Sequence, residues 1–458
     1  MTHPRSNQQH PCEVIATQGE VLRALAVVGL SDAERVDALR GLEELKNTAA
    51  ALQARLAVDL DASQREEQRL AGVPAVKRGL GVAAQVGLAR RESPHRAGVL
   101  LGLAKVLHAE MPHTSAAFEA GVISEFRAQV IVKETACLTR EDRQAVDALV
   151  AGDRDRLSML GTRELAGEVK RHAYRLDPQS FADRAAQAVD DRTVTLRPAP
   201  DCMTYLTALL PVAEGVAVYA ALTRAADTAR AAGDERSRGQ VLADTLVERV
   251  TGQATASKVA VGVHLVMTDR TLFHDGVEPG IVIGQGPIPA GLARDLVGAA
   301  PELSSWIKRL YTDEGGQLVA MESKQRTFPD GLAEFILVRD QTCRAPWCDA
   351  VIRQTDHITP VSEGGATSAI NGQGLCEACN YAKQAPGWQY APLCTGTGLS
   401  GGPAGSGFGG TDLDPPTAAG SDPPVRQVTT PTGTSYPLSA PPRWPPSPQP
   451  GQGDVTAA

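Results

Sequence analysis

The sequence predicts a mostly α-helical protein with a smaller α+β part, and three observations support this fold class. Apolar residues recur at three- and four-residue steps over most of residues 31–175. The alternation typical of strands begins only after Asp177-Pro178. Of the 31 prolines, 13 lie between Thr395 and Ala458 among many Gly, Ser and Thr residues. This last stretch can bury too little apolar area to offset its conformational entropy, so we expect a disordered Pro/Gly-rich tail.

A long helix is expected from Ser31, because Ser31 and Glu34 have the spacing of a capping box. An apolar stripe follows on one face of this helix: Leu42, Leu45, Ala49, Leu52 and Leu56. We interpret the stripe as core packing within the chain, since it is shorter than the three to four heptads of a typical coiled coil. Self-association through the N-terminal helices is the alternative.

Four more helices are expected before the pattern changes, at Ala97–His108, Ser115–Glu119, Glu125–Cys137 and Arg140–Ala151. Ala117 and Gly121 have the spacing of a helix-turn-helix motif, which would suggest DNA recognition. Arg127, however, stands where that motif usually places an apolar residue. We therefore expect a plain helical hairpin at this point.

The middle of the chain predicts a mixture of strands and helices. The expected strands are Thr193–Arg197, Met203–Leu210, a β-rich piece at Val259–Met267, and Gln317–Met321. The expected helices are Ala213–Ala232, Ser237–Val250, Ala290–Val297 and Asp330–Arg339. Gly286-Pro287-Ile288-Pro289 is expected to be a rigid turn.

Composition excludes some classes of protein. The 45 Lys and Arg residues against 53 Asp and Glu residues give a net charge of −8, and aromatic residues make up 4%. Both values argue against a protein that coats nucleic acid by bulk charge or by base stacking. No apolar run approaches the roughly 20 residues that span a bilayer, so we expect no membrane contact. Met1 to Glu13 lacks the apolar region of a signal peptide, so we expect a cytoplasmic, reduced protein.

Four of the eight cysteines form two closely spaced pairs. Cys343 and Cys348 enclose four residues, and Cys376 and Cys379 enclose two. In a reduced protein, two such short-loop pairs predict a tetrahedral zinc site with four thiolate ligands. Cys394 lies outside the two pairs, and we give it no role.

Polar residues suited to catalysis lie between and beside these pairs. They are Asp356-His357, Asn371 and Asn380, with Gly364-Gly365 between His357 and Asn371. A metal-dependent nuclease needs an oxygen ligand for a hard cation, a base that deprotonates water, and a means of holding that base in line with a phosphate. This group of residues offers all three, which indicates a catalytic site.

The stretch from Cys343 to Trp388 resembles the HNH endonuclease module of the ββα-metal superfamily. It reads CRAPWCDAVIRQTDHITPVSEGGATSAINGQGLCEACNYAKQAPGW. The resemblance implies a hairpin and a helix that hold one Mg²⁺-like ion, with Asp356 and Asn380 as metal ligands. It also implies that His357 is the general base and that Asn371 orients this histidine.

Asn380 is a departure, because the third letter of the HNH motif is most often histidine. An amide oxygen suits a hard cation, so the substitution favours Mg²⁺ or Mn²⁺ over softer ions. Lys383 follows Asn380 by about one helical turn. It is a candidate contact for a phosphate, with a solvated surface lysine as the alternative.

Upstream segments are similar to the thirteen-E-twelve repeat family, in which a long helical domain of unknown function precedes an HNH module. The similarity rests on six segments: RLDP from Arg175, RTVTLRPAPDCMTYLTALLP from Arg192, VYAALTRAA, LADTLVE, the GPIP segment, and RTFPDGLAEFILVRDQTC, which ends at Cys343. Cys202 departs from the family, which usually has glycine there.

The sequence as a whole predicts five parts: an N-terminal tail (1–30), a helical domain with a β-hairpin near 193–210 (31–255), a mixed α/β connector (256–335), an HNH module (336–392) and the tail (393–458). The predicted function is hydrolysis of phosphodiester bonds in double-stranded DNA, with catalytic Mg²⁺ or Mn²⁺ and structural Zn²⁺. The alternative is a catalytically inactive, zinc-braced module that binds DNA or protein.

Overall fold

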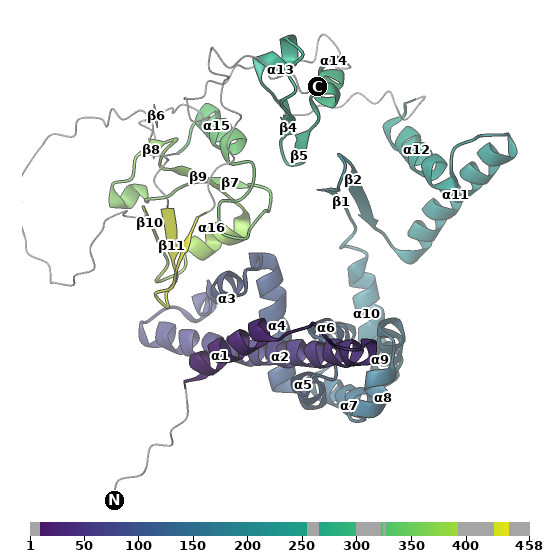
Figure 1. Ribbon diagram of the computed structural model, residues 1–458, viewed down its shortest axis with the longest axis vertical. Coiled ribbons are helices and arrows are strands. Elements are labelled where there is room, and N and C mark those ends of the chain that lie inside the picture. Colours follow the sequence, from purple (N-terminus) through teal and green to yellow (C-terminus); the bar gives the residue numbers. More distant parts are fainter. Residues whose placement is uncertain (1–9, 254–264, 299–321, 324–326, 393–425, 439–458) are drawn as a thin grey trace, which may run out of the picture. The chain divides into compact units, whose positions relative to one another are not determined.

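The structure is a computed structural model that describes residues 10–253, 265–298, 322–323, 327–392 and 426–438. Helices dominate these residues and the sheets are small, which confirms the expected fold class (Figure 1). The chain divides into two compact units. The first contains Met1–Val58 and Leu103–Pro178, and the second contains Asp59–Gly102 and Gln179–Ala458. Helices α2 and α4 belong partly to each unit.

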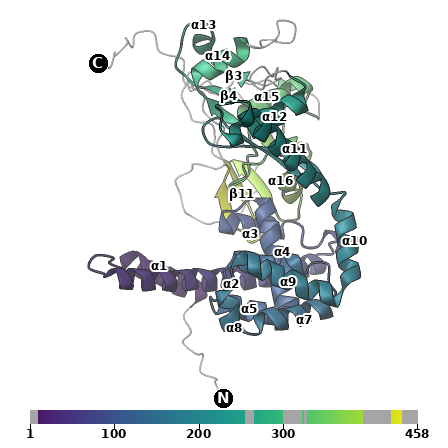
Figure 2. The ribbon, with the colours of Figure 1, turned by 90° about the vertical axis from the view of Figure 1, so that its right-hand side faces the viewer.

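The described residues of the first unit form helices and no strands (Figure 2). The helices are α1 (Pro11–Ala24), the first part of α2 (Asp32–Leu70), the last part of α4 (Pro94–Glu110), α5 (Pro112–Glu119), α6 (Glu125–Glu134), α7 (Arg140–Ala151), α8 (Arg154–Met159) and α9 (Thr162–Leu176). The capping box at the start of α2 is confirmed: Ser31 N donates to Glu34 Oε2 (2.7 Å), and Glu34 N donates to Ser31 Oγ (3.3 Å). Helix α1 lies in the segment expected to be a tail.

The core of the first unit consists of large apolar side chains, including Met111, Phe118, Ile131, Leu157 and Leu165, which are almost fully buried. One buried carboxylate joins two helices of this core. Asp147 of α7 accepts hydrogen bonds from His113 N (2.7 Å) and Thr114 N (2.9 Å) at the start of α5. Because the first N–H groups of a helix have no partner within it, Asp147 acts as a cap supplied by a neighbouring helix.

The leucine stripe of α2 does not pack in the core of its own unit, contrary to our expectation. Leu42, Leu45, Leu52 and Leu56 are 40–53% exposed. The helix instead buries its opposite face, where Asn47 Nδ2 donates to Gly121 O (3.1 Å). Gly121 has φ +76°, and a Cβ atom there would lie 2.7 Å from Glu44 O. The turn between α5 and α6 therefore approaches α2 closely, which explains this glycine without a role in DNA recognition.

The second unit begins with the remaining part of α2, a short 3₁₀ turn η1 (Ala75–Lys77), α3 (Val82–Arg90) and the start of α4. After α10 (Pro178–Ala188), the predicted hairpin is confirmed as β1 (Thr193–Pro198) and β2 (Thr204–Leu209), paired antiparallel. Cys202 in its turn has φ +57°. Glycine adopts this backbone region most easily, which gives a physical reason for the family's usual glycine at this position.

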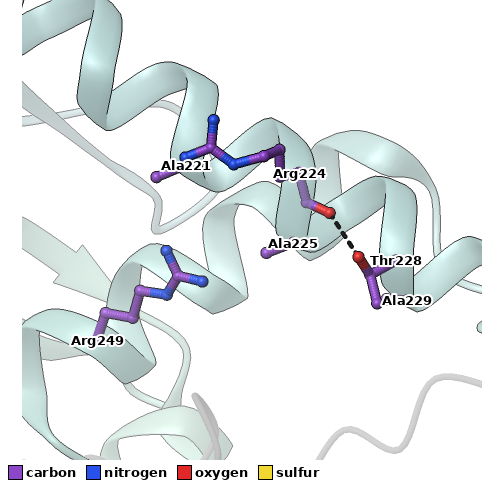
Figure 3. Close-up of a pocket in the computed structure, with 6 residues that line it drawn as sticks. All are labelled: Ala221, Arg224, Ala225, Thr228, Ala229 and Arg249. Carbon is purple, nitrogen blue, oxygen red and sulfur yellow. Dashed lines mark hydrogen bonds between the residues drawn. The ribbon is translucent and has the colours of Figure 1, made fainter.

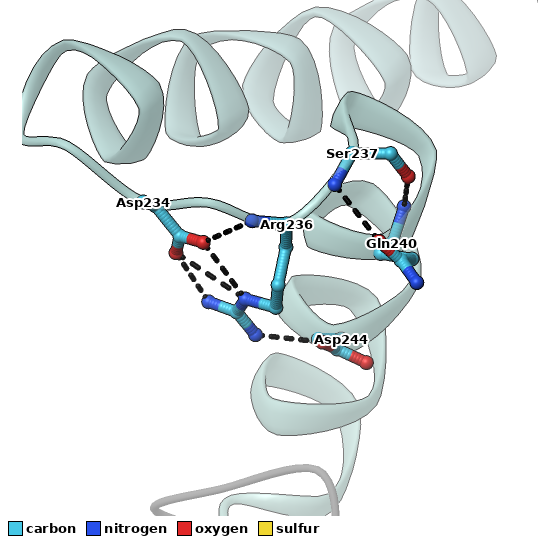
Figure 4. Close-up of polar contacts among 5 residues, drawn as sticks. All are labelled: Asp234, Arg236, Ser237, Gln240 and Asp244. Atoms are coloured by element: carbon cyan, nitrogen blue, oxygen red, sulfur yellow. Dashed lines mark hydrogen bonds and ion pairs between the residues drawn. The ribbon is translucent and has the colours of Figure 1, made fainter.

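Helices α11 (Val212–Ala231) and α12 (Arg238–Thr251) pack against each other, close to their predicted bounds. Arg236 fixes the loop between them through ion pairs with Asp234 and Asp244, both 2.6 Å (Figure 4). Hydrogen bonds from Arg236 lower the pKa of Asp234 to about 2. A shallow hollow of about 550 Å³ on this helix pair is lined by Ala221, Arg224, Ala225, Thr228, Ala229 and Arg249 (Figure 3).

A three-stranded sheet follows, in the order β3 (Leu265–Val266), β4 (Gly280–Val282) and β5 (Gly286–Ile288), with helices α13 (Asp269–Phe273) and α14 (Ala290–Gly298). The segment expected to be a rigid turn thus contains strand β5. Pro287 is tolerated because β5 is an edge strand, where an N–H group is not needed for pairing. Most of the predicted strand at Val259–Met267, and all of that at Gln317–Met321, lie outside the described residues.

The C-terminal part contains helices α15 (Asp330–Asp340) and α16 (Glu377–Lys383), a 3₁₀ turn η3 (Val361–Glu363) and short strands. The strands are β6 (Glu322–Ser323), β7 (Gln354–His357), β8 (Thr367–Ser368), β9 (Gly372–Leu375), β10 (Gln389–Pro392), β11 (Arg426–Thr429) and β12 (Ser435–Pro437). They pair as β6–β8, β7–β9 and β10–β11–β12.

Strands β11 and β12 correct the expectation that the whole of 393–458 is disordered. Val428 of β11 and Leu438 are buried in an apolar cluster with Leu88 of α3, Trp388 and Tyr390. This short segment of the tail therefore has apolar side chains and a place to bury them, which the overall composition of the tail conceals. Cys394 lies outside the described residues.

Candidate functional site

The site is built on the β7–β9 hairpin and the helix α16 that follows it. The strands are antiparallel, with Gln354 opposite Leu375 and Asp356 opposite Gln373. Helices α15 and α16 both contact β7, and the four elements lie together in Figure 1. Asp340 at the end of α15 accepts a hydrogen bond from Gly374 N (2.7 Å) and is paired with Arg339 (2.7 Å). This fully buried, paired carboxylate fastens α15 to β9.

The four paired cysteines converge at one end of this hairpin. Their Sγ atoms all lie within 4.8 Å of one another, and all four side chains are buried. The Sγ atoms of Cys348 and Cys376 are 3.7 Å apart. Sulfurs that bind one zinc ion at the usual 2.3 Å would be about 3.8 Å apart in a tetrahedron, so the cluster fits a four-thiolate metal site.

The electrostatics of the cluster also suit a cation. Hydrogen bonding with Cys343 lowers the pKa of Cys376 and raises the pKa of Cys379. Four thiols packed this closely do not all ionise easily without a counter-charge. A divalent cation would allow all four to bind as thiolates, because its charge offsets their mutual repulsion.

His357 lies at the end of β7, in a partly buried setting. Its Nε2 atom is 2.9 Å from Thr367 Oγ1, and its ring centroid is 4.4 Å from that of Phe328. Desolvation lowers the pKa of His357 below its ordinary value. The neutral imidazole, which is the form able to accept a proton, is therefore favoured at neutral pH.

Asn371 braces the loop that follows His357. Its Oδ1 atom accepts from Thr359 N (2.9 Å), and its Nδ2 atom donates to Thr359 O (3.0 Å) and Ala366 O (2.8 Å). The side chain thus makes its hydrogen bonds to backbone groups, while the imidazole contacts Thr367. Gly365 completes the loop: a Cβ atom there would collide with Thr359 O.

Two side chains of α16, those of Asn380 and Lys383, contact side chains of β7. Lys383 Nζ donates to Asp356 Oδ2 (2.5 Å) and to His357 O. Asn380 is buried, and its Nδ2 atom donates to Gln354 Oε1. Its Oδ1 atom is buried without a hydrogen-bond partner. The Asp356 carboxylate and the Asn380 amide oxygen are both oxygen donors of the kind that a hard divalent cation prefers.

Four residues of this site were not expected from the sequence: Phe328, Gln354, Thr367 and Gln373. Strand alternation would have placed Gln354 on the same face as Asp356, two residues away. Thr367 and Phe328 contact His357 only through the tertiary fold, so no local sequence pattern predicts these contacts. Gln373 stands opposite Asp356, and neither its Oε1 nor its Nε2 has a partner although the residue is 2% exposed.

Comparison with protein families agrees with this geometry. A family model described as a domain of unknown function, DUF222, matches residues 36–340. The chain belongs to this DUF222 family. A second family model, described as HNH endonuclease, matches residues 341–385, which contain the cysteine cluster, Asp356, His357 and Asn380. The order of the two matched regions confirms the expected architecture of a helical domain followed by an HNH module. No curated protein and no solved structure matches the chain.

Among the described residues, no helix has both the length and the apolar character needed to cross a bilayer.

Proposed function

We propose that this member of the DUF222 family is an HNH endonuclease that hydrolyses phosphodiester bonds of double-stranded DNA. The observation that carries the proposal is the pairing of Asp356 on β7 with Lys383 on α16, directly beside His357. Asn380 of α16 bonds to Gln354 on the same strand, and four buried cysteines cluster in the same module. This is the arrangement that a one-cation nuclease needs, with oxygen donors and a base on adjacent residues.

Asp356 and Asn380 would hold the catalytic cation. The carboxylate and the unpartnered Asn380 Oδ1 are oxygen donors, and such donors favour Mg²⁺ or Mn²⁺. When bound, the cation supplies positive charge for the phosphate and the leaving 3′ oxygen.

His357 would take a proton from the attacking water. Its lowered pKa keeps the ring neutral, and Thr367 and Phe328 fix the ring's position. Asn371 would orient this histidine indirectly, because it holds the backbone of Thr359 two residues away. Lys383 would keep Asp356 in place and offer a positive charge to a phosphate on the same side.

The cysteine cluster would hold a structural zinc ion. Four thiolates close the coordination sphere of zinc, which leaves no position for a substrate, so this ion would hold the fold together. The need for reduced thiols is also why we place the protein in the cytoplasm.

A zinc-braced binding module without catalysis is the second candidate function. The observation that favours it is the ammonium group of Lys383, which already pairs with the Asp356 carboxylate. The two functions are separated by incubating the zinc-loaded protein with labelled duplex DNA, first in EDTA at a concentration that spares the zinc and then with Mg²⁺ or Mn²⁺. The nuclease predicts new DNA ends only when the cation is added. Retarded but intact DNA under every condition would support the binding module.

Besides DNA, we propose a second copy of the chain as a binding partner. This proposal rests on the exposed leucine stripe of α2, which is apolar, regular and unburied within its own unit. A second copy of the chain that presents the same stripe would bury it.

A further inference from the structure

The buried position of Gln373 is one where an unpaired polar side chain lowers the stability of the fold. It is 2% exposed, and neither atom of its amide group has a hydrogen-bond partner. Two residues further along β9, on the same face, Leu375 is fully buried. This face therefore accepts an apolar side chain, so the amide of Gln373 is not explained by packing. An unpaired buried amide is destabilising unless something else satisfies it.

The register of the hairpin places Gln373 on the same face as Asp356. Residues directly opposite each other in an antiparallel pair have their side chains on the same face, and Gln373 is opposite Asp356. Gln354 lies on this face too, and it accepts a hydrogen bond from Asn380 of α16. The face of the hairpin that carries Gln373 is thus the face that α16 covers.

Two amide groups on this side of the module have buried oxygen atoms without partners, Gln373 Oε1 and Asn380 Oδ1. The two neighbours of Gln373 on β9 are glycines whose backbones pack closely elsewhere, Gly372 against Ile336 and Phe328, and Gly374 against Ile352. Gln373 is therefore the residue of β9 that offers a polar side chain on the face that carries Asp356.

We propose that Gln373 is a further oxygen donor of the cation site, serving the divalent cation together with Asp356 and Asn380. This inference rests on the proposed function, because it concerns the same cation. Its chemistry is consistent with that of the other two residues: a neutral amide oxygen adds a ligand for a hard cation without adding a charge. The buried amide would then be satisfied in the cation-bound protein.

The experiment is a titration of zinc-loaded, full-length protein with Mn²⁺, followed by electron paramagnetic resonance of the free ion. Gln373→Met keeps the length of the side chain and removes the oxygen donor. Gln373→Glu keeps the oxygen and adds a charge. The matched control is Thr355→Val, since Thr355 is the neighbour of Asp356 on the opposite face of β7.

We expect Gln373→Met to weaken Mn²⁺ binding at least tenfold, as loss of a supporting residue usually does at metal sites. Gln373→Glu should bind Mn²⁺ more tightly than the wild type, and Thr355→Val should stay within about twofold of it. Zinc content and the melting temperature without Mn²⁺ show whether each variant is folded. If Gln373→Met did not fold, the Mn²⁺ affinity of Gln373→Glu would decide whether Gln373 is an oxygen donor. Tighter Mn²⁺ binding than that of the wild type would support this role, and equal or weaker binding would overturn it.

Equal Mn²⁺ affinity of wild type, Gln373→Met and Gln373→Glu would overturn the role of Gln373 and leave the proposed nuclease intact. A wild-type protein that binds zinc but no Mn²⁺ at millimolar concentration would overturn the catalytic cation site itself, and the role of Gln373 with it.

Discussion

Asn371→Ala is the substitution whose effect follows most directly from the geometry of the site. It removes three side-chain hydrogen bonds to the backbone of the loop after His357, with lengths of 2.8–3.0 Å. At about 1 kcal/mol each, their loss should lower the free energy for opening this loop by about 3 kcal/mol. Since 1.4 kcal/mol is a factor of ten, amide hydrogen exchange in the loop should accelerate by about a hundredfold.

Hydrogen-exchange mass spectrometry of peptides that span residues 356–368 measures this effect. Ser368→Ala is a suitable control, because it removes one bond to the same residue, the acceptor for Asn371 N at 3.1 Å. It should accelerate exchange by about tenfold or less. Asn371→Asp should be at least as disruptive as Asn371→Ala, because its carboxylate would face the carbonyl oxygens of Thr359 and Ala366. Exchange that Asn371→Ala leaves unchanged, or changes less than Ser368→Ala does, would refute the bracing role.

Three further predictions concern other parts of the chain. Removal of zinc by a strong chelator should unfold the HNH module and abolish its protection from proteolysis. Adding Zn²⁺ back should restore this protection. A module that stays protease-resistant without zinc would contradict the structural role of the ion. Truncation after residue 425 removes Val428 and Leu438, whose burial contributes at most about 3–6 kcal/mol to the free energy of unfolding. The module should therefore melt at a clearly lower temperature. Truncation after Leu438 should change the melting temperature little. Leu45→Glu on the stripe of α2 should shift the sedimentation coefficient from that of a dimer to that of a monomer. Leu149→Glu on α7, at a similarly exposed position, should leave the dimer intact. A wild-type protein that is monomeric at high micromolar concentration would contradict the proposed self-association.

The parts of the fold that sequence predicted well are those controlled by local patterns. The capping box at Ser31 and Glu34 sets the start of α2, and α7 begins and ends at the predicted residues. The four cysteines were grouped correctly because metal ligands in tight turns impose short, recognisable spacings. In each case the deciding interaction joins residues close in sequence.

The parts that sequence did not predict depend on contacts between distant residues. The periodicity of α2 identifies an apolar face, but it carries no information on whether that face is covered, and the helix buries the side with Asn47 instead. The tail was judged by its average composition, which hides the few apolar residues that pack at β11 and β12. At the site, Thr367 reaches His357 only because β8 and β7 are brought together by the fold.

The central claim is that His357 is the base of a cation-dependent nuclease, and cleavage of supercoiled plasmid tests it most directly. Wild-type protein, His357→Ala and the control Thr355→Val would be compared at equal zinc content with Mg²⁺ and with Mn²⁺. The wild type and Thr355→Val should convert the plasmid to nicked or linear forms, and His357→Ala should lose at least a hundredfold in rate, the usual contribution of a positioned base. Cleavage by His357→Ala at the wild-type rate would contradict the mechanism.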